Sequence, residues 1–316
     1  FRFAPENFHL DSRVRLVKVF GGYFKGFSSL LRRLPPHWLY RRMIRESYDY
    51  EVAFQAGVPT WLLSHSPSRA VKYAWMHGLD MDHAQEHNRF DRVIFVSQEV
   101  KETFAPLSAY PERLTVCYNP MDWRGILEKA GEPLPEGASS FPQEDAPVLC
   151  SVGRLSPEKG YLRLLQCHRR LLDQGLRHRL WLVGEGEERA SLEKYIEEQG
   201  LTDSVVLWGY QNNPYRFMAR ADIYVCSSFN EGFNVAATEA LLLDRPVVST
   251  AVCGARELLG EDIYGIVTAN DDQSLLEGLK RMLRPDTRRH YEQMAKQREQ
   301  AFCRVDRMAA MEALFE

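Results

Sequence analysis

Short apolar runs alternate with amphipathic stretches through the second half of this chain. Each run holds β-branched and other apolar residues between polar ends, which is typical of buried parallel strands. The runs occupy residues 148–152, 180–183, 205–208, 223–227, 246–250 and 265–268. Because helical patterns separate them, they predict a doubly wound α/β sheet with helices on both faces and a ligand at the carboxyl ends of the strands.

The first half shows the same alternation. Strand-like runs at residues 50–54, 71–75, 92–97 and 114–118 predict a second parallel sheet. Residues 14–20 also have a strand pattern and precede two glycines. Residues 26–46 are basic and aromatic, and Pro35-Pro36 limits them to two short helices.

A connector separates the two halves of the chain. Residues 131–147 hold four prolines together with glycine, serine and acidic residues, a composition typical of a solvated linker. We therefore expect one domain over 1–143 and another over 144–290. The helical pattern that starts at residue 287 predicts a C-terminal helix, which we assign to 291–316.

The stretch 230–240 joins the strand at 223–227 to an apolar, helix-forming segment through a turn that contains glycine. At such a junction the first backbone N–H groups have no partner in the helix, and they carry part of its positive dipole, so they favour an anion. The candidate amides are those of Phe233, Asn234 and Val235. The sequence therefore predicts a phosphate-binding turn.

Two carboxylates stand eight positions apart around this turn. Glu231 and Gly232 lie in the loop, whereas Glu239 falls about a turn and a half into the helix. This spacing resembles the E-x(7)-E motif of retaining glycosyltransferases with the GT-B fold, in particular the family-4 glycosyltransferases. The resemblance implies that Glu231 contacts the transferred sugar, that Glu239 accepts hydrogen bonds from the ribose, and that the turn at Gly232 binds the donor.

A second motif follows the strand at 148–152. The sequence Gly-Arg-Leu-Ser-Pro-Glu-Lys-Gly over 153–160 resembles the G-R-L-x-x-x-K-G signature of the same family. Breaking a nucleotide-sugar bond expels a diphosphate, so cations must meet the charge that develops on the leaving oxygens. Next to Gly153, Arg154 offers a bidentate fork and Lys159 a point charge. The alternative is a solvated turn with incidental basic residues.

Three further candidates lie at predicted strand ends. His77 ends a strand of the first half, and the resemblance implies that it faces the donor sugar; a lone histidine is otherwise more often structural. Gly184 and Tyr210 follow two strands of the second half, where the family holds the base. Tyr210 would stack on that base. The alternative for both is an ordinary turn.

Composition narrows the class of protein. With 316 residues, 45% of them hydrophobic, the chain can bury two domain cores. Its six cysteines are scattered without a C-x-x-C pair, which indicates reduced thiols in a cytoplasmic protein. No apolar run approaches the length of about 18 residues that a membrane-spanning helix needs.

The net charge of −3 is unevenly distributed. Up to Trp75 there are 12 Lys and Arg residues against 5 Asp and Glu, whereas the remainder has 28 against 38. Because aromatic residues are interleaved with the basic ones, we expect this first segment to dock on an anionic membrane surface. One alternative is that these arginines line the side of the interdomain cleft where a sugar acceptor would bind. Another is that they only keep one face of a helix in contact with water. No zinc, helix-turn-helix or RNP-like pattern accompanies them, so we expect no nucleic-acid partner.

The D-x-D sequence at 80–82 is the pattern that places a metal ion in another glycosyltransferase fold. Here it follows the turn at His77, and Arg154 and Lys159 already supply positive charge. We therefore expect neither a metal ion nor another cofactor. No His/Cys spacing indicates zinc, and no G-x-S-x-G motif indicates a hydrolase.

The resemblance implies a GT-B fold, with two Rossmann-like domains facing a cleft. We expect the first domain to lack its first βα unit and to bind the acceptor. The second domain would bind the donor, and the C-terminal helix would return to the first domain. We expect a retaining, metal-independent transfer of a hexose from a nucleotide-diphosphate sugar, with UDP as the nucleotide. The acceptor would be a hydroxyl of a glycan or a lipid-linked glycan.

This activity would serve the synthesis of cell-surface polysaccharide, lipopolysaccharide or glycolipid. The protein would lie in the cytoplasm, peripheral on the inner face of the cytoplasmic membrane. Two alternatives of the same fold are a nucleotide-sugar epimerase and a phosphorylase. A third alternative is a non-catalytic subunit that binds a sugar nucleotide.

Overall fold

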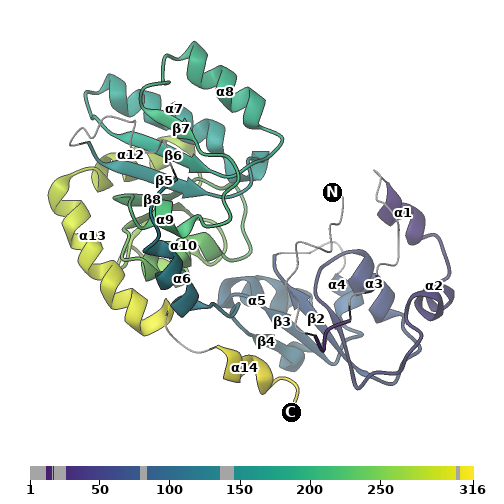
Figure 1. Ribbon diagram of the computed structural model, residues 1–316. Coiled ribbons are helices and arrows are strands. Elements are labelled where there is room, and N and C mark those ends of the chain that lie inside the picture. The colour runs from purple at the N-terminus through teal and green to yellow at the C-terminus, as the bar shows by residue number, and fades with distance from the viewer. Residues whose placement is uncertain (1–11, 16, 18–25, 79–83, 136–145, 304–306) are drawn as a thin grey trace. The chain divides into compact units, whose positions relative to one another are not determined.

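The chain divides into two compact units, each with one β-sheet (Figure 1). The computed structural model describes residues 12–15, 17, 26–78, 84–135, 146–303 and 307–316. Unit 1 comprises Phe1–Phe95 and Thr103–Thr115, and unit 2 comprises Val96–Glu102 and Val116–Glu316. The domain boundaries that we assigned at 143/144 and 290/291 stay predictions.

The sheet of unit 1 has four strands, whose order follows the chain. β1 pairs with β2 and β2 with β3, both in parallel, so that Tyr73 of β2 lies opposite Arg92 of β3. The strands are β1 (Tyr50–Ala53), β2 (Val71–Met76), β3 (Arg92–Phe95) and β4 (Leu114–Val116). They confirm the four strands predicted between residues 50 and 118.

Short helices pack around this sheet. α3 contacts β1, and both α2 and α4 contact α3. The helices of unit 1 are α1 (Phe27–Leu31), α2 (Pro36–Met43), α3 (Val58–Ser64) and α4 (Ala84–His87), with 3₁₀ turns η2 (Ala105–Leu107) and η3 (Pro111–Arg113). Most of α5 (Gln98–Phe104) belongs to unit 2. Pro36 begins α2, where its missing N–H has no helical partner to lose, so Pro35-Pro36 separates two short helices as predicted. The strand predicted over 14–20 falls mainly outside the described residues.

The sheet of unit 2 has the order β10-β9-β8-β5-β6-β7, with every pair parallel. Its strands are β5 (Val148–Val152), β6 (Arg179–Val183), β7 (Val205–Leu207), β8 (Ile223–Cys226), β9 (Val247–Thr250) and β10 (Ile266–Thr268). These confirm the six predicted strands. The chain runs outward from β5 to β7 and then returns to β8 on the other side of β5. A crevice therefore opens where the loops after β5 and β8 diverge, at their carboxyl ends.

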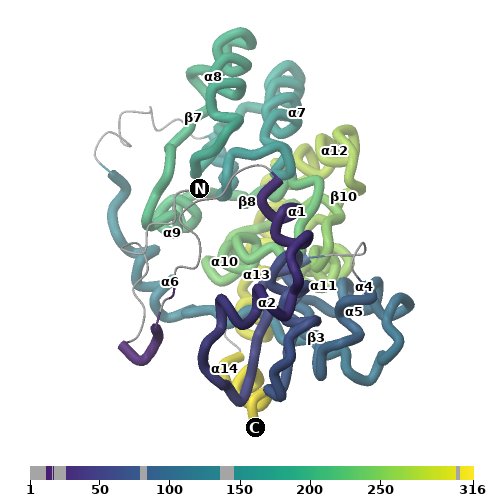
Figure 2. The backbone as a smooth tube through the Cα atoms, turned by 90° about the vertical axis from the view of Figure 1, so that its right-hand side faces the viewer, coloured from purple at the N-terminus to yellow at the C-terminus, as the bar shows by residue number. Residues whose placement is uncertain are grey.

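Helices cover both faces of this sheet, as Figures 1 and 2 show: α7, α8 and α12 lie on one face, and α9 and α10 on the other. Together with α5, the helices and helical turns of unit 2 are α6 (Trp123–Ala130), η5 (Pro157–Lys159), α7 (Tyr161–Asp173), α8 (Arg189–Glu198), α9 (Tyr215–Met218), α10 (Val235–Leu242), α11 (Ala255–Leu259), α12 (Asp272–Met282), α13 (Pro285–Arg298), the π-helical turn η6 (Glu299–Cys303) and α14 (Met308–Glu312). This is the doubly wound arrangement that the sequence predicts.

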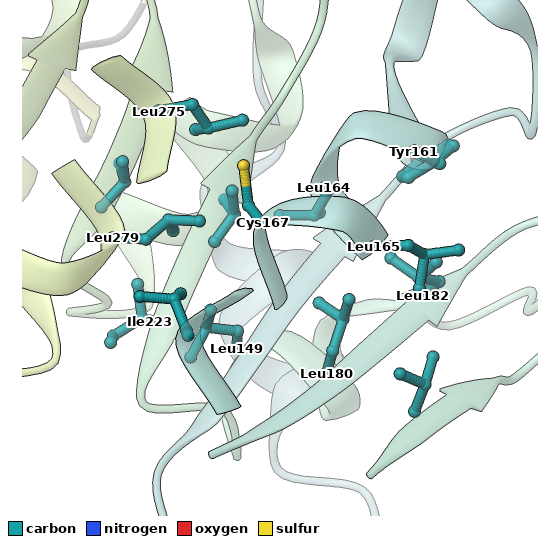
Figure 3. Close-up of a cluster of buried hydrophobic side chains, with 14 of the residues drawn as sticks. Leu149, Tyr161, Leu164, Leu165, Cys167, Leu180, Leu182, Ile223, Leu275 and Leu279 are labelled. Atoms are coloured by element: carbon teal, nitrogen blue, oxygen red, sulfur yellow. The ribbon is translucent and has the colours of Figure 1, made fainter. Parts of the chain in front are cut away.

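The main core of unit 2 lies between the sheet and the helices α7 and α12, which cover one of its faces (Figure 3). Leu149 of β5 and Ile223 of β8 meet Leu164 of α7 and Leu279 of α12, and all four side chains are fully or almost fully buried. Burying such side chains contributes about 1.5–3 kcal/mol each relative to exposing them. The loops at the strand ends therefore start from a rigid base.

The C-terminal segment differs from the single helix that the pattern predicts. α13 ends in the π-helical turn η6, and α14 follows beyond residues 304–306, which are not described. The guanidinium of Arg298 donates to the carbonyls of Glu257 (2.6 Å) and Leu258 (2.8 Å), and it lies over the ring of Phe302. Arg307 lies over the same ring. These contacts, which helical periodicity does not encode, accompany the wider turn.

All six cysteines are free, and five of them are buried. Among the described residues, no helix is both long enough and apolar enough to cross a bilayer.

Candidate functional site

A cavity of about 410 Å³ opens at the carboxyl ends of β5 and β8, in the crevice of unit 2. Eight of the predicted site residues line it: Gly153, Arg154, Lys159, Glu231, Phe233, Asn234, Val235 and Glu239. The lining is completed by Ser151, Val152, Tyr161, Tyr224, Cys226, Ser228 and Ala236. The fold therefore brings together the two motifs, which lie more than 70 positions apart in the chain.

Gly184 allows two strand ends to approach each other at the edge of the site. Its φ is +148°, and a Cβ atom there would lie 1.8 Å from the carbonyl oxygen of Gly153. The backbone N–H of Gly153 donates to Val183 (3.0 Å), and that of Gly184 to Gly209 (2.9 Å). Gly184 does not line the cavity, so the structure gives it a packing role, and contact with a base stays a prediction.

Gly160 has a similar role between α7 and β8. Its φ is +65°, and a Cβ atom would lie 2.3 Å from the carbonyl oxygen of Ser227. The hydroxyl of Ser227 donates to the carbonyl of Lys159 at 2.9 Å. The glycine of the G-R-L-x-x-x-K-G signature thus lets the start of α7 press against the end of β8, which places Lys159 beside the loop of Glu231.

An ion pair joins the two motifs inside the cavity. Lys159 Nζ lies 2.6 Å from Glu231 Oε1, and both side chains are largely buried. The hydroxyl of Ser228 donates to the same oxygen at 2.6 Å. No described residue donates a hydrogen bond to the other carboxylate oxygen of Glu231, so that oxygen can receive a ligand. Arg154 is exposed and adds a second cation to the cavity lining.

The start of α10 differs slightly from the predicted anion seat. Asn234 is the N-cap, and its side chain accepts from the N–H of Ala237 at 2.8 Å. The helix begins at Val235, so among its first three amides those of Val235 and Ala236 are left for a ligand, because that of Ala237 is taken by the cap. Phe233 is buried, with its ring 5.7 Å from that of Tyr118. Anion binding by this turn stays a prediction.

Glu239 projects into the cavity from α10 and is titratable near neutral pH. Burial raises the pKa of its carboxyl group to about 7. The hydroxyl of Tyr215, on α9, donates to Glu239 Oε1 at 3.2 Å, which works against this increase in pKa. A ligand that donated further hydrogen bonds to Glu239 would favour its charged form.

Three predicted residues lie elsewhere. His77 follows β2 in unit 1, with its ring centre 4.6 Å from that of Phe54, and burial lowers the pKa of its imidazole. Its Nε2 is buried and has no hydrogen-bond partner among the described residues. Tyr210 is 72% exposed and does not line the cavity. Gly232 lies between two lining residues without lining the cavity itself.

Two polar residues that donate hydrogen bonds to the predicted carboxylates were not themselves predicted. The sequence could have suggested Ser228, because it lies at the end of a predicted strand, three positions before Glu231. Tyr215 is part of no motif, and only the packing of α9 against α6 and β5 places its hydroxyl beside Glu239. Sequence reasoning had no signal for it.

Metal ligands are not grouped in the described part of the chain. No three His, Cys, Asp or Glu side chains there are arranged to hold an ion. The D-x-D sequence at 80–82 lies outside the described residues, so its role stays an open prediction.

Comparisons with known proteins agree with this geometry. The family model described as glycosyl transferases group 1 matches residues 136–300. An N-acetylgalactosamine-N,N'-diacetylbacillosaminyl-diphospho-undecaprenol 4-alpha-N-acetylgalactosaminyltransferase of Campylobacter jejuni is 35% identical over 201 residues, which cover 63% of this chain and 52% of the relative. The lipopolysaccharide core biosynthesis glycosyltransferase LpsE of Rhizobium meliloti is 34% identical over 123 residues, 39% of this chain and 35% of the relative. The chain thus spans about half the length of these relatives or less.

Solved structures show the fold. HepE of Anabaena, in complex with UDP, has a TM-score of 0.68 and 22% sequence identity, over 84% of this chain and 77% of that protein. The fold is the GT-B fold, with two Rossmann-like α/β domains, as expected from the motifs.

Proposed function

Because the chain belongs to the glycosyl transferases group 1 family, we propose that it is a retaining glycosyltransferase that moves a hexose from a nucleotide-diphosphate sugar to a hydroxyl group. The observation that carries the proposal is the Lys159–Glu231 pair. It joins the two motifs within one cavity, beside the exposed Arg154 and the start of α10.

The donor would bind in the cavity of unit 2. Its diphosphate would lie among Arg154, Lys159 and the first amides of α10, where cations and the helix dipole favour negative charge. Lys159 uses one of its three N–H donors for Glu231 and keeps two for phosphate oxygens. Glu231 would then hold the sugar and Glu239 the ribose. UDP is the nucleotide we favour, since the HepE structure contains it.

The reaction would need no protein nucleophile. The bond between the sugar C1 and the diphosphate oxygen breaks with its electron pair on that oxygen, where Arg154 and Lys159 stabilise the charge. The acceptor oxygen bonds to C1 from the same face, and its proton passes to the leaving diphosphate. This front-face attack retains the configuration at C1. His77, whose buried Nε2 has no hydrogen-bond partner in the described part of the chain, would orient the sugar.

The acceptor would be a glycan or lipid-linked glycan, in cell-surface polysaccharide or lipopolysaccharide synthesis. The names of the two relatives support this class, since one concerns a diphospho-undecaprenol substrate and the other the lipopolysaccharide core. We place the reaction at the inner face of the cytoplasmic membrane. Neither a metal ion nor another cofactor enters the proposed steps.

A donor screen tests this function. UDP-, GDP- and ADP-hexoses are each added at about 1 mM, and the melting temperature is measured; one nucleotide class should raise it. The stabilising donor is then incubated with a lipid-linked glycan, and the anomeric configuration of the product is read by NMR. The proposal is wrong if no sugar nucleotide binds, and an inverted product would remove the front-face mechanism.

A further inference from the structure

Arg163, in the first turn of α7, is a buried cation that the proposed chemistry does not use. Arg163 is only 3% exposed, and no described carboxylate lies within ion-pair distance of it, although the charges of Asp272 and Asp271 favour its charged form. Its Nε donates to the carbonyl of Ser227 at 2.7 Å, and Nη2 donates to that of Ser228 at 2.6 Å. Burying an arginine without a direct ion-pair partner is costly, so this position calls for a specific explanation.

A second side chain completes a clamp on the same loop. Asn270, which follows β10, accepts from Arg163 Nη2 at 2.9 Å and donates through Nδ2 to the carbonyl of Phe229 at 2.9 Å. The guanidinium of Arg163 also lies 3.7 Å from the centre of the Phe229 ring. Three consecutive carbonyls, from Ser227 to Phe229, are therefore fixed by Arg163 and Asn270. We call these two residues the loop clamp.

The clamped segment leads directly to the reacting groups. Ser228 donates from its hydroxyl to Glu231 Oε1, and Glu231 is only two positions beyond Phe229. We propose that the loop clamp positions Glu231 for its contact with the sugar, an inference that rests on the proposed function. The planar fork of arginine suits this task, because two parallel N–H groups can hold two carbonyls in one fixed geometry, which a lysine cannot do.

The chain offers a matched control. Arg245 also donates to two backbone carbonyls of unit 2, from Nε to Leu243 (2.8 Å) and from Nη1 to Ala221 (3.0 Å). Leu243 and Ala221 precede β9 and β8, so this arginine sits at the opposite, amino edge of the same sheet. Losing it should cost stability without moving Glu231.

A double-mutant cycle separates positioning from stability. Arg163→Met should lower kcat about 30-fold and change the donor KM less than about 3-fold, at a temperature well below melting. In a Glu231→Gln background, the same substitution should change kcat less than about 3-fold, because the group that it positions is already lost. Arg163→Lys should recover part of kcat, and Arg245→Met should leave kcat within about 2-fold of the parent. Equal losses in both backgrounds would overturn the inference.

A second measurement does not depend on activity. Amide hydrogen exchange should accelerate in the peptide over 227–235 for Arg163→Met and for the milder Asn270→Ala, but not for Arg245→Met. Unchanged exchange there would overturn the clamp. If the parent protein neither binds nor cleaves any sugar nucleotide, the proposed function fails, and the exchange experiment still decides whether the clamp fixes the loop.

Discussion

Glu239 is held close to the midpoint of its titration at neutral pH, because burial raises its pKa to about 7. In the proposed complex, ribose hydroxyls donate to this carboxyl group, so the donor favours the charged form. Charged Glu239 is scarce below pH 7 and dominates above it. Donor affinity should therefore rise with pH through this range and level off above it, with about a tenfold difference in Kd between pH 6 and pH 8.

Calorimetry with the donor across that pH range measures this effect. Glu239→Gln keeps an oxygen for Tyr215 but cannot titrate, so it should bind with a flat pH profile. Glu239→Ala should weaken binding by about 1–3 kcal/mol. Unchanged affinity in Glu239→Ala would remove ribose binding from this residue, and a pH dependence that persists in Glu239→Gln would assign the titration to another group.

Arg154 and Lys159 should matter most when the diphosphate departs. Charge on the leaving oxygens grows as the bond breaks, so Arg154→Ala and Lys159→Ala should each lower kcat about a hundredfold, with smaller changes in donor affinity. Steady-state kinetics give both values. Lys194→Ala, which removes an exposed lysine of α8, serves as the control and should have no effect. Activity should also persist in EDTA, whereas a strict need for added Mn²⁺ would instead implicate the D-x-D sequence at 80–82.

At the scale of elements, sequence pattern predicted the strands well, because each one is buried and bounded by polar residues. The ends of β5, and the place of Glu239 on a helix, could be predicted from the periodicity of apolar residues and the spacing of the motif alone. The first residue of α10 depended on whether Asn234 capped the helix, and the turn η6 depended on contacts of Arg298 and Arg307 with Phe302. Such tertiary contacts leave no periodic trace in the sequence, so these features could not be predicted.

The junction of α7 and β8 tolerates only glycine at position 160. Gly160→Ala would combine a left-handed φ with a methyl group 2.3 Å from the carbonyl of Ser227. We expect it to lower stability by about 2–4 kcal/mol and to reduce kcat, since Lys159 would shift.

Gly175 provides the matched control for this position. Its φ is also left-handed (+77°), but a methyl group added there would have no other atom within 4 Å. Gly175→Ala should therefore cost only about 1 kcal/mol and leave kcat unchanged. Chemical denaturation and kinetics of both variants measure the difference. Equal losses of stability would show that backbone conformation alone, and not the close approach to Ser227, constrains Gly160.

At the scale of the whole molecule, the basic first segment is the basis for predicted membrane docking. Arg33, Arg41, Arg42 and Arg45 are exposed, and Trp38 is 56% exposed. Arg32, in contrast, pairs with Glu86 at 3.0 Å and donates to the carbonyl of Gly57, so it is committed within unit 1. Lys25 and Phe24 immediately precede the basic, aromatic stretch at 26–46, and we expect them to contribute to docking, but they lie outside the described residues.

Vesicle co-sedimentation tests this docking. Binding should rise with anionic lipid content and fall with added salt, because each exposed arginine contributes about 1 kcal/mol near such a surface. Changing Arg33, Arg41, Arg42 and Arg45 to serine should abolish it. The control changes four exposed arginines of unit 2 to serine: Arg177, Arg256, Arg284 and Arg289. If the first variant binds vesicles as well as the parent does, the arginines have another role, such as lining the acceptor side.

Every residue that lines the cavity belongs to unit 2, and the clamp beside it does as well. In the proposed function, nucleotide recognition and the choice of acceptor are thus encoded in separate parts of the chain. Such a division lets substitutions accumulate in one part without spoiling the other. It also suggests a practical use: hybrids that join this unit 2 to the first domain of a relative should keep the donor of the parent while adopting a new acceptor.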